Sequence, residues 1–400
     1  MSIKKIVISG TGCALADYLY NGISFNGPCF SKYSSKETGD GGLNPGKLVF
    51  TEELEKFSGR PYDKILDELT GGSVPDSFNV GGPSLVSMIH ASQMLSIEYF
   101  DVNFFGIAGN DETAEKILSI VRSTPLKINN YLTNGKKATP FTDVFSDSKY
   151  DGGHGERTFI NNIGAAWDYS PDHIDDSFFD SDIVCFGGTA LVPWIHDNLT
   201  SLLTRAKKHN CITIVNTVFD FRNEKNNPGA KWPLVKSIKD YNLIDLLIMD
   251  CEEAFKISGK SSIEDAADFF MSVKVSSFII TNGANDLYAK SSGGLFMKTK
   301  MLRLPVSEKV KNLLRSSPGL KGDTTGCGDN FAGGIITSVA LQMKDKHRSH
   351  FDLIEAISWG VASGGLTCFI PGGTYLENFS GEKLNKVIEY QKDYLKQISK

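Results

Sequence analysis

Short apolar runs alternate with longer segments of helical period along most of this 400-residue chain. The runs are rich in β-branched residues and are bounded by glycine or polar residues, as in parallel strands that are buried on both faces. This alternation predicts one doubly wound α/β domain over residues 1–400, with a mostly parallel sheet. Ligands of such sheets bind beyond the carboxyl ends of the strands. The expected strands are 3–10, 104–109, 182–188, 211–218, 243–249 and 276–283, and helical period is seen in 111–121, 192–209 and 262–273.

Two segments interrupt this alternation of strands and helices. Residues 18–80 are rich in Gly, Ser, Asn and Pro and show no long helical period. Residues 139–165 alternate apolar and polar positions around a glycine turn, a pattern typical of a β-hairpin. We expect these two insertions to form a small β-rich lid over the site that excludes water from it.

The composition and net charge of the chain argue against several classes of protein. The net charge of −5 argues against nonspecific binding to nucleic acid or to an anionic membrane. No apolar run approaches the roughly 20 residues that span a bilayer. Seven cysteines are dispersed without a CxxC pair, which indicates reduced thiols and neither a disulfide scaffold nor a zinc site. We therefore expect a soluble, cytoplasmic protein that binds neither nucleic acid nor membrane.

The strongest chemical signal is a glycine-rich loop that runs into an apolar helical segment at 322–343. Gly326, Cys327 and Gly328 place backbone N–H groups at a helix N-terminus, where they stabilise the charge of a phosphoryl group in transfer. Asp329 lies at the same helix start, where it can accept a proton from an attacking hydroxyl. A helix cap without chemistry is the alternative interpretation of such a cluster.

The sequence DTTGCGDNFAGG (323–334) resembles the C-terminal signature of the PfkB carbohydrate-kinase family, whose usual form is DTxGAGDxFxxG. Cys327 replaces the usual alanine and keeps its backbone N–H. The resemblance implies a ribokinase-like fold and ATP-dependent phosphorylation of a hydroxyl. It also implies Asp329 as the catalytic base and Gly326–Gly328 as the anion hole.

Further segments resemble the family in the same order along the chain. GTGCALAD (10–17) is similar to the first strand and turn, which implies Asp17 as the ligand of substrate hydroxyls; one carboxylate can bind two vicinal hydroxyls. FFGIAGNDETAEKI (104–117) resembles a strand–turn–helix unit of the family. GERTF (155–159) looks like a lid strand, in which Arg157 either reaches substrate or braces the lid.

The family's N-terminal signature, GGxxxN, falls at Gly81 and Gly82, both candidates for substrate binding. Val86 stands where the substrate-binding asparagine is expected, and a valine cannot form that hydrogen bond. In a closed site, a polar group without its partner costs on the order of 1–3 kcal/mol. Either the substrate differs from ordinary sugars, or another group such as Asn79 or Asp76 supplies the hydrogen bond.

The nucleotide side is expected after the later strands. DCEEAF (250–255) resembles the NxxE motif that organises Mg²⁺, with Glu253 and Asp250 as candidate ligands, although an acidic helix N-terminus gives the same pattern. Residues 216–222 occupy the place of a family motif, and its alignment leaves Asn216 and Asp220 as alternatives for facing the phosphates. Residues 370–375 fit the loop near adenine. The resemblance implies ATP and Mg²⁺, with K⁺ bound near Asp323 in many relatives. The nucleotide-binding candidates are Asn216, Asp220, Thr281, Gly283, Asp323, Thr324 and Thr325.

The sequence as a whole predicts an ATP-dependent kinase that phosphorylates a hydroxyl of a sugar or sugar-like small molecule. A kinase for a nucleoside or another small alcohol is the first alternative. A non-catalytic relative that binds ligand is the second. Because lid sheets in this family often pair between subunits, a homodimer through the lid strands is the predicted assembly.

Overall fold

A computed structural model describes residues 4–37, 39–317, 322, 325–345, 350–370 and 372–399. Its larger sheet has the order β14-β13-β12-β11-β10-β9-β1-β5-β6. All neighbours from β12 to β6 are parallel, and β13 and β14 extend the edge antiparallel. The predicted doubly wound, mostly parallel sheet is therefore confirmed. Its strands are β1 (Ile6–Gly12), β5 (Phe100–Gly109), β6 (Lys127–Gly135), β9 (Ile183–Gly187), β10 (Ile212–Asn216), β11 (Leu246–Asp250), β12 (Ser277–Thr281), β13 (Leu287–Ser291) and β14 (Leu302–Leu304).

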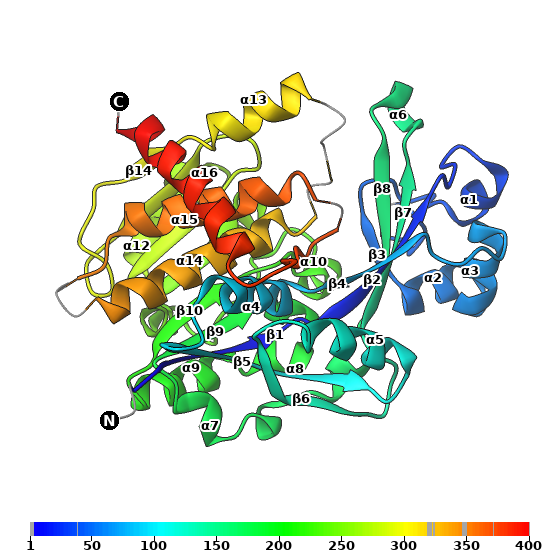
Figure 1. Ribbon diagram of the computed structural model, residues 1–400. Coiled ribbons are helices and arrows are strands. Elements are labelled where there is room, and N and C mark those ends of the chain that lie inside the picture. Colours follow the sequence, from blue (N-terminus) through cyan, green and yellow to red (C-terminus); the bar gives the residue numbers. More distant parts are fainter. Residues whose placement is uncertain are drawn as a thin grey trace.

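Helices cover both faces of this sheet (Figure 1). Alternate strand residues point to opposite faces, so Val184 and Val215 belong to one apolar cluster, whereas Ile183 and Ile214 belong to the other. Burial on both faces explains why the strands read as continuous apolar runs. One cluster includes side chains of α4 (Pro83–Met94), α5 (Glu112–Val121), α14 (Cys327–Lys344), α15 (Leu353–Thr367) and α16 (Glu382–Ile398), and the other those of α7 (Asp176–Phe179), α8 (Pro193–Asp197), α9 (Leu199–Lys208), α11 (Cys251–Ser258) and α12 (Ile263–Ser272).

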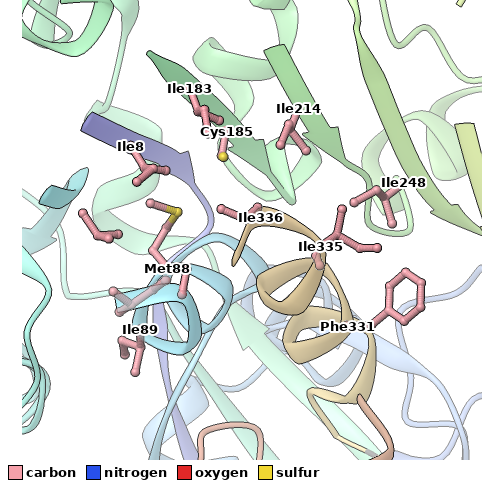
Figure 2. Packing of buried hydrophobic residues seen from close by; sticks show 14 of the residues in the cluster. Ile8, Met88, Ile89, Ile183, Cys185, Ile214, Ile248, Phe331, Ile335 and Ile336 are labelled. Carbon is pink, nitrogen blue, oxygen red and sulfur yellow. The ribbon is translucent and has the colours of Figure 1, made fainter. Parts of the chain in front are cut away.

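Helix α14 lies in the centre of the first of these layers. Figure 2 shows Ile335 and Ile336 of α14 beside Met88 of α4, with strand residues such as Ile8 packed above them. Two successive glycines let α14 approach two helices: a Cβ on Gly333 would lie 2.7 Å from the Cβ of His90, and one on Gly334 would lie 2.5 Å from the carbonyl oxygen of Trp359. The site at the N-terminus of α14 therefore rests on a densely packed base.

A second, five-stranded sheet stands beside the large one, in the order β3-β8-β7-β2-β4 (Figure 1). Strand β2 follows β1 after two residues, so the chain passes directly from one sheet to the other. Strands β7 and β8 pair antiparallel, which confirms the hairpin predicted in 139–165. The strands are β2 (Leu15–Asn21), β3 (Leu48–Phe50), β4 (Ser77–Gly81), β7 (Phe141–Asp147) and β8 (Glu156–Asn162).

Residues 18–80, which were expected to be β-rich, also contain short helices. The segment contains α1 (Pro28–Tyr33), α2 (Thr51–Ser58) and α3 (Tyr62–Thr70), which pack on one face of the small sheet. Each helix is short and buries only two residues, which is too few to produce a recognisable helical period in the sequence.

The helical segment predicted at 192–209 is two helices, α8 and α9, separated at Asn198. In the described part of the chain, no helix has the length and apolar character to cross a membrane. The remaining elements are α6 (Tyr150–Gly153), α10 (Phe221–Asn226), α13 (Glu308–Ser316) and the short 3₁₀ helices η1 (Gly164–Asp168), η2 (Pro171–His173), η3 (Thr189–Leu191) and η4 (Ile238–Leu243).

Candidate active site

The predicted anion loop forms the start of α14. Gly326 is the N-cap residue with a φ of 73°, a left-handed conformation that favours glycine. Cys327 and Gly328 are the first two helical residues, and N–H groups at these positions have no carbonyl partner within a helix. They also lie at the positive end of the 18-residue helix dipole. The arrangement suits a phosphoryl group.

A buried amide fixes this loop from inside. The side-chain nitrogen of Asn330 donates to the carbonyl oxygens of Gly326 and Gly373, each at 2.8 Å. Asn330 thereby joins the anion loop to the loop that the sequence places near adenine. Its oxygen lies 3.0 Å from Nδ1 of His90 on α4. The sequence pattern did not single out Asn330 or His90, because their role depends on contacts between distant helices.

Asp329 is half-buried at the same helix start. Desolvation raises the pKa of its carboxyl to about 7. Its negative charge helps to raise the pKa values of the Cys13 thiol, just beyond β1, and of Glu253 on α11. Asp329 therefore lies among the residues that follow the parallel strands, with a pKa close to that of an efficient general base.

A row of four polar residues crosses the small sheet. The register pairs Asp17 of β2 with Asn79 of β4 on one side and with Thr142 of β7 on the other, and Thr142 pairs with Asn161 of β8. Side chains paired in this way share one face of a sheet. Asp17, Thr142 and Asn161 are buried, and Asn161 donates to the Thr142 hydroxyl at 2.9 Å. The charge of Asp17 also helps to raise the pKa of Cys13, so this face is directed toward the strand ends and Asp329.

Gly81 and Gly82 support this row. A Cβ on Gly81 would lie 2.2 Å from a carboxylate oxygen of Asp17, so glycine makes room for that side chain. Gly82 is the N-cap of α4 and packs on the backbone of Cys13. Val86 is buried in α4. Asn79 lies beside Asp17, whereas Asp76 is exposed near the far end of the strand pair and accepts a hydrogen bond from the Asn21 N–H.

Arg157 connects the small sheet to the start of the anion loop. It lies on the same face of β8 as Asn161, and its guanidinium donates to the hydroxyl of Thr325, just before the anion loop. The guanidinium also lies over the Phe159 ring, 5.7 Å from its centroid. Of the two roles considered for Arg157, this contact corresponds to bracing the lid. The candidates Asp323 and Thr324 lie outside the described residues.

The two acidic candidates for magnesium sit at the start of α11. Asp250 caps the helix by accepting from the Glu253 N–H at 2.8 Å, and the Glu253 carboxylate accepts from the Asp250 N–H at 3.0 Å. Glu253 is buried and also accepts from the Thr217 hydroxyl at 2.6 Å. Burial and the neighbouring charge of Asp250 raise the pKa of Glu253. Two neighbouring carboxyl groups fit Mg²⁺, which usually takes one or two carboxylates together with phosphate oxygens.

The remaining nucleotide candidates divide into two groups. Asn216 ends β10 and Thr281 ends β12, both half-buried at the ends of parallel strands, and Gly283 follows in a turn with a φ of 56°. Asp220 is different because it caps α10, is buried, and lies 3.3 Å from Nε2 of His196. Of the two residues left open in 216–222, Asn216 is therefore the better placed for phosphates.

Residues 76–377 match the sequence model of the pfkB family carbohydrate kinases. The chain belongs to the PfkB family. The matched region includes the glycine pair at the start of α4, the acidic start of α11 and the anion loop.

Solved structures share the fold of this PfkB-family protein. Adenosine kinase from Schistosoma mansoni in complex with 2-fluoroadenosine has a TM-score of 0.67 at 15% identity, covering 94% of this chain and 98% of that one. Adenosine kinase from Anopheles gambiae in complex with P1,P4-di(adenosine-5) tetraphosphate has a TM-score of 0.66 at 18% identity, covering 92% and 97%. An E. coli protein assigned as ribokinase II, in complex with ATP and Mg²⁺, has a TM-score of 0.61 at 15% identity, covering 98% and 100%. These similarities establish the ribokinase-like fold.

Proposed function

We propose that this PfkB-family protein is an ATP-dependent kinase that phosphorylates a hydroxyl of a sugar or sugar-like molecule. The observation that carries the proposal is Asp329, a carboxyl with its pKa raised to about 7 beside a helix-start anion loop. The polar row with Asp17 supplies the acceptor side, since a carboxylate flanked by amide and hydroxyl groups suits a polyol.

The reaction is a direct in-line transfer. Asp17 holds two hydroxyls of the acceptor and thereby orients the reacting one. Asp329 accepts the proton of that hydroxyl as its oxygen attacks the γ-phosphorus of ATP, and the bond from this phosphorus to the bridging oxygen breaks so that ADP leaves. The N–H groups of Gly326, Cys327 and Gly328 stabilise the charge that develops on the transferred group. Asp250 and Glu253 would hold Mg²⁺, which when bound neutralises phosphate charge.

The small sheet acts in this proposal as the lid. Arg157 and Thr325 connect it to the anion loop, so movement of the sheet is coupled to the place of phosphoryl transfer. We also propose a homodimer through the edge strands β3 and β4 of this sheet, since edge strands present backbone groups for pairing. We propose the cytoplasm as its location, since none of the seven cysteines is paired in a disulfide in the structure.

A nucleoside is the second candidate acceptor. Next to the polar row lies an apolar row on the same face, in which Leu19 pairs with Val144 and Val144 with Phe159. A polar row beside an apolar row matches a ribose with an attached base. Adenosine kinases of the same fold support this candidate.

An ADP-release assay with a panel of sugars, sugar acids and nucleosides, in Mg²⁺ and K⁺, tests the proposal. We expect turnover with acceptors that carry vicinal hydroxyls, and the preferred class separates the two candidates. Absence of turnover across the panel, with ligand binding retained, would favour the non-catalytic alternative.

A further inference from the structure

Two cysteines meet beside the anion loop. Cys327 is the first residue of α14, and Cys368 is the C-cap residue of α15. Their sulfur atoms lie 3.5 Å apart, and both residues are half-buried. Gly364 explains this proximity, because a Cβ at that position would lie 2.8 Å from the Cys327 carbonyl oxygen. The glycine lets the two helices approach closely, and one turn later Cys368 faces the Cys327 side chain.

The chemistry of this pair differs from that of the other thiols. The hydrogen bond with Cys327 lowers the pKa of Cys368 to about 7, so a substantial part of the pair carries a thiolate at neutral pH. Burial instead raises the pKa values of Cys13 and Cys185, which makes these two thiols inert. Cys29 is exposed on α1, in the helical cover of the small sheet. The thiolate is the form that reacts with oxidants.

We propose that Cys327 and Cys368 form a reversible disulfide in response to peroxide, and that this bond switches off the anion loop. The Cys368 thiolate attacks one peroxide oxygen, the O–O bond breaks, and hydroxide leaves as a sulfenic acid forms. The Cys327 sulfur then attacks the sulfenic sulfur, its proton leaves with the displaced oxygen as water, and the S–S bond forms. Two thiols and one H₂O₂ give one disulfide and two waters. A dithiol reductant reverses the oxidation by thiol–disulfide exchange.

The consequence for activity rests on the proposed kinase function. A disulfide requires the two sulfur atoms to move about 1.5 Å closer than the 3.5 Å seen here. The backbone N–H of Cys327 belongs to the anion loop, and the carbonyl of Cys368 accepts from the Gly322 N–H at 3.0 Å. Both cysteines are thus joined to the loop that must be positioned for transfer. Because a misplacement of about 1 Å can cost on the order of a hundredfold in rate, we expect oxidation to lower kcat at least about tenfold.

The test treats the full-length protein with H₂O₂ at neutral pH and measures the disulfide and the activity separately. Peptide mapping without reduction detects a cross-link between the peptides that contain Cys327 and Cys368. ADP release is measured before oxidation, after it, and after dithiothreitol. Cys368→Ser is expected to keep the basal activity and lose the peroxide response. Cys29→Ser, which removes an exposed thiol, is expected to keep both the basal activity and the peroxide response.

The expected result is the cross-link together with a loss of kcat that dithiothreitol restores. Absence of the cross-link in folded protein overturns the proposal, as does a cross-link that leaves kcat unchanged. Peroxide inactivation that persists in Cys368→Ser also overturns it. If the reduced protein has no kinase activity, the proposed function fails, whereas the cross-link still decides whether the pair forms a disulfide.

Discussion

Nδ1 of His90 lies 3.0 Å from the side-chain oxygen of Asn330, and this pair sits directly beneath the anion loop. The Asn330 nitrogen donates to the carbonyls of Gly326 and Gly373, so its oxygen must accept. His90 therefore carries its proton on Nδ1, and Nε2 accepts from the Ser363 hydroxyl at 2.9 Å. Burial holds the pKa of His90 well below its usual range, which keeps the ring neutral.

Replacing Asn330 by alanine tests this network. Asn330→Ala leaves the N–H of His90 and the Gly373 carbonyl without this partner, whereas the Gly326 carbonyl keeps its bond from the backbone N–H of residue 330. We expect this change to lower the free energy of unfolding by about 2 kcal/mol. We also expect kcat to fall at least about tenfold with little change in KM, because the anion loop loses its support. Urea unfolding and ADP release measure the two effects. Asn103→Ala on β5 is the control, with kcat retained; an equal kcat in Asn330→Ala would refute the positioning role.

Asp17→Asn tests the acceptor site. The amide removes the negative charge that binds two hydroxyls, so we expect KM for the acceptor to rise at least about tenfold while the affinity for ATP is unchanged. Asp76→Asn is the matched control, because Asp76 is exposed near the other end of the same strand pair. Steady-state kinetics with each substrate varied gives both constants. Equal acceptor KM values in the two variants would show that Asp17 does not bind the acceptor.

Glu253→Gln tests the metal site. Glutamine preserves the reciprocal cap with Asp250 but removes a carboxylate, so we expect the Mg²⁺ concentration for half-maximal rate to rise at least about tenfold. Without Mg²⁺, the variant should be at least as stable as the wild type, because repulsion with Asp250 is relieved. The neighbouring, exposed Glu252→Gln should leave the Mg²⁺ titration unchanged. A loss of stability in Glu253→Gln without a change in the Mg²⁺ titration would show that Glu253 serves only as a structural helix cap.

The pH dependence of the rate follows from Asp329. A general base must be deprotonated, and desolvation raises the pKa of this carboxyl to about 7. We therefore expect kcat/KM for the acceptor to increase with pH through a midpoint near pH 7 and to level off above about pH 8. Initial rates at saturating Mg–ATP across this range provide the profile. A flat profile between about pH 5.5 and 8 would contradict the assignment.

Much of the fold could be predicted from local sequence. The buried strands are continuous apolar runs, and the anion loop, the acidic start of α11 and the hairpin of β7 and β8 each lie in one short segment. The helices α2 and α3 were missed because eight or nine residues with two buried positions carry too little period.

The candidate site could be predicted only where its residues belong to contiguous motifs. Asp17 and Asp329 lie in such motifs. Thr142 and Asn161 become neighbours of Asp17 only through the register of three strands. The alternation of apolar and polar positions in the hairpin could assign each residue to a face of its strand, but not to these neighbours. The pairing of Asp220 with His196 likewise depends on tertiary contacts, so the sequence left Asn216 and Asp220 as alternatives.

The most direct measurement compares Asp329→Asn with Asp143→Asn. Both aspartates have pKa values raised to about 7 by desolvation, but Asp143 lies on the opposite face of the small sheet from Asp17, where it accepts a hydrogen bond from the Tyr62 hydroxyl. The folded protein keeps the Asp143 proton up to about pH 7, whereas the unfolded chain loses it near 3.8, so this group costs stability as pH rises through that window. Asp143→Asn is thus expected to fold, with reduced pH dependence, and to retain kcat.

For Asp329→Asn we predict a loss of turnover of at least about a thousandfold, with ATP binding measured by calorimetry largely retained. Turnover of Asp329→Asn within a few fold of the Asp143→Asn control would contradict the assignment of Asp329 as the base.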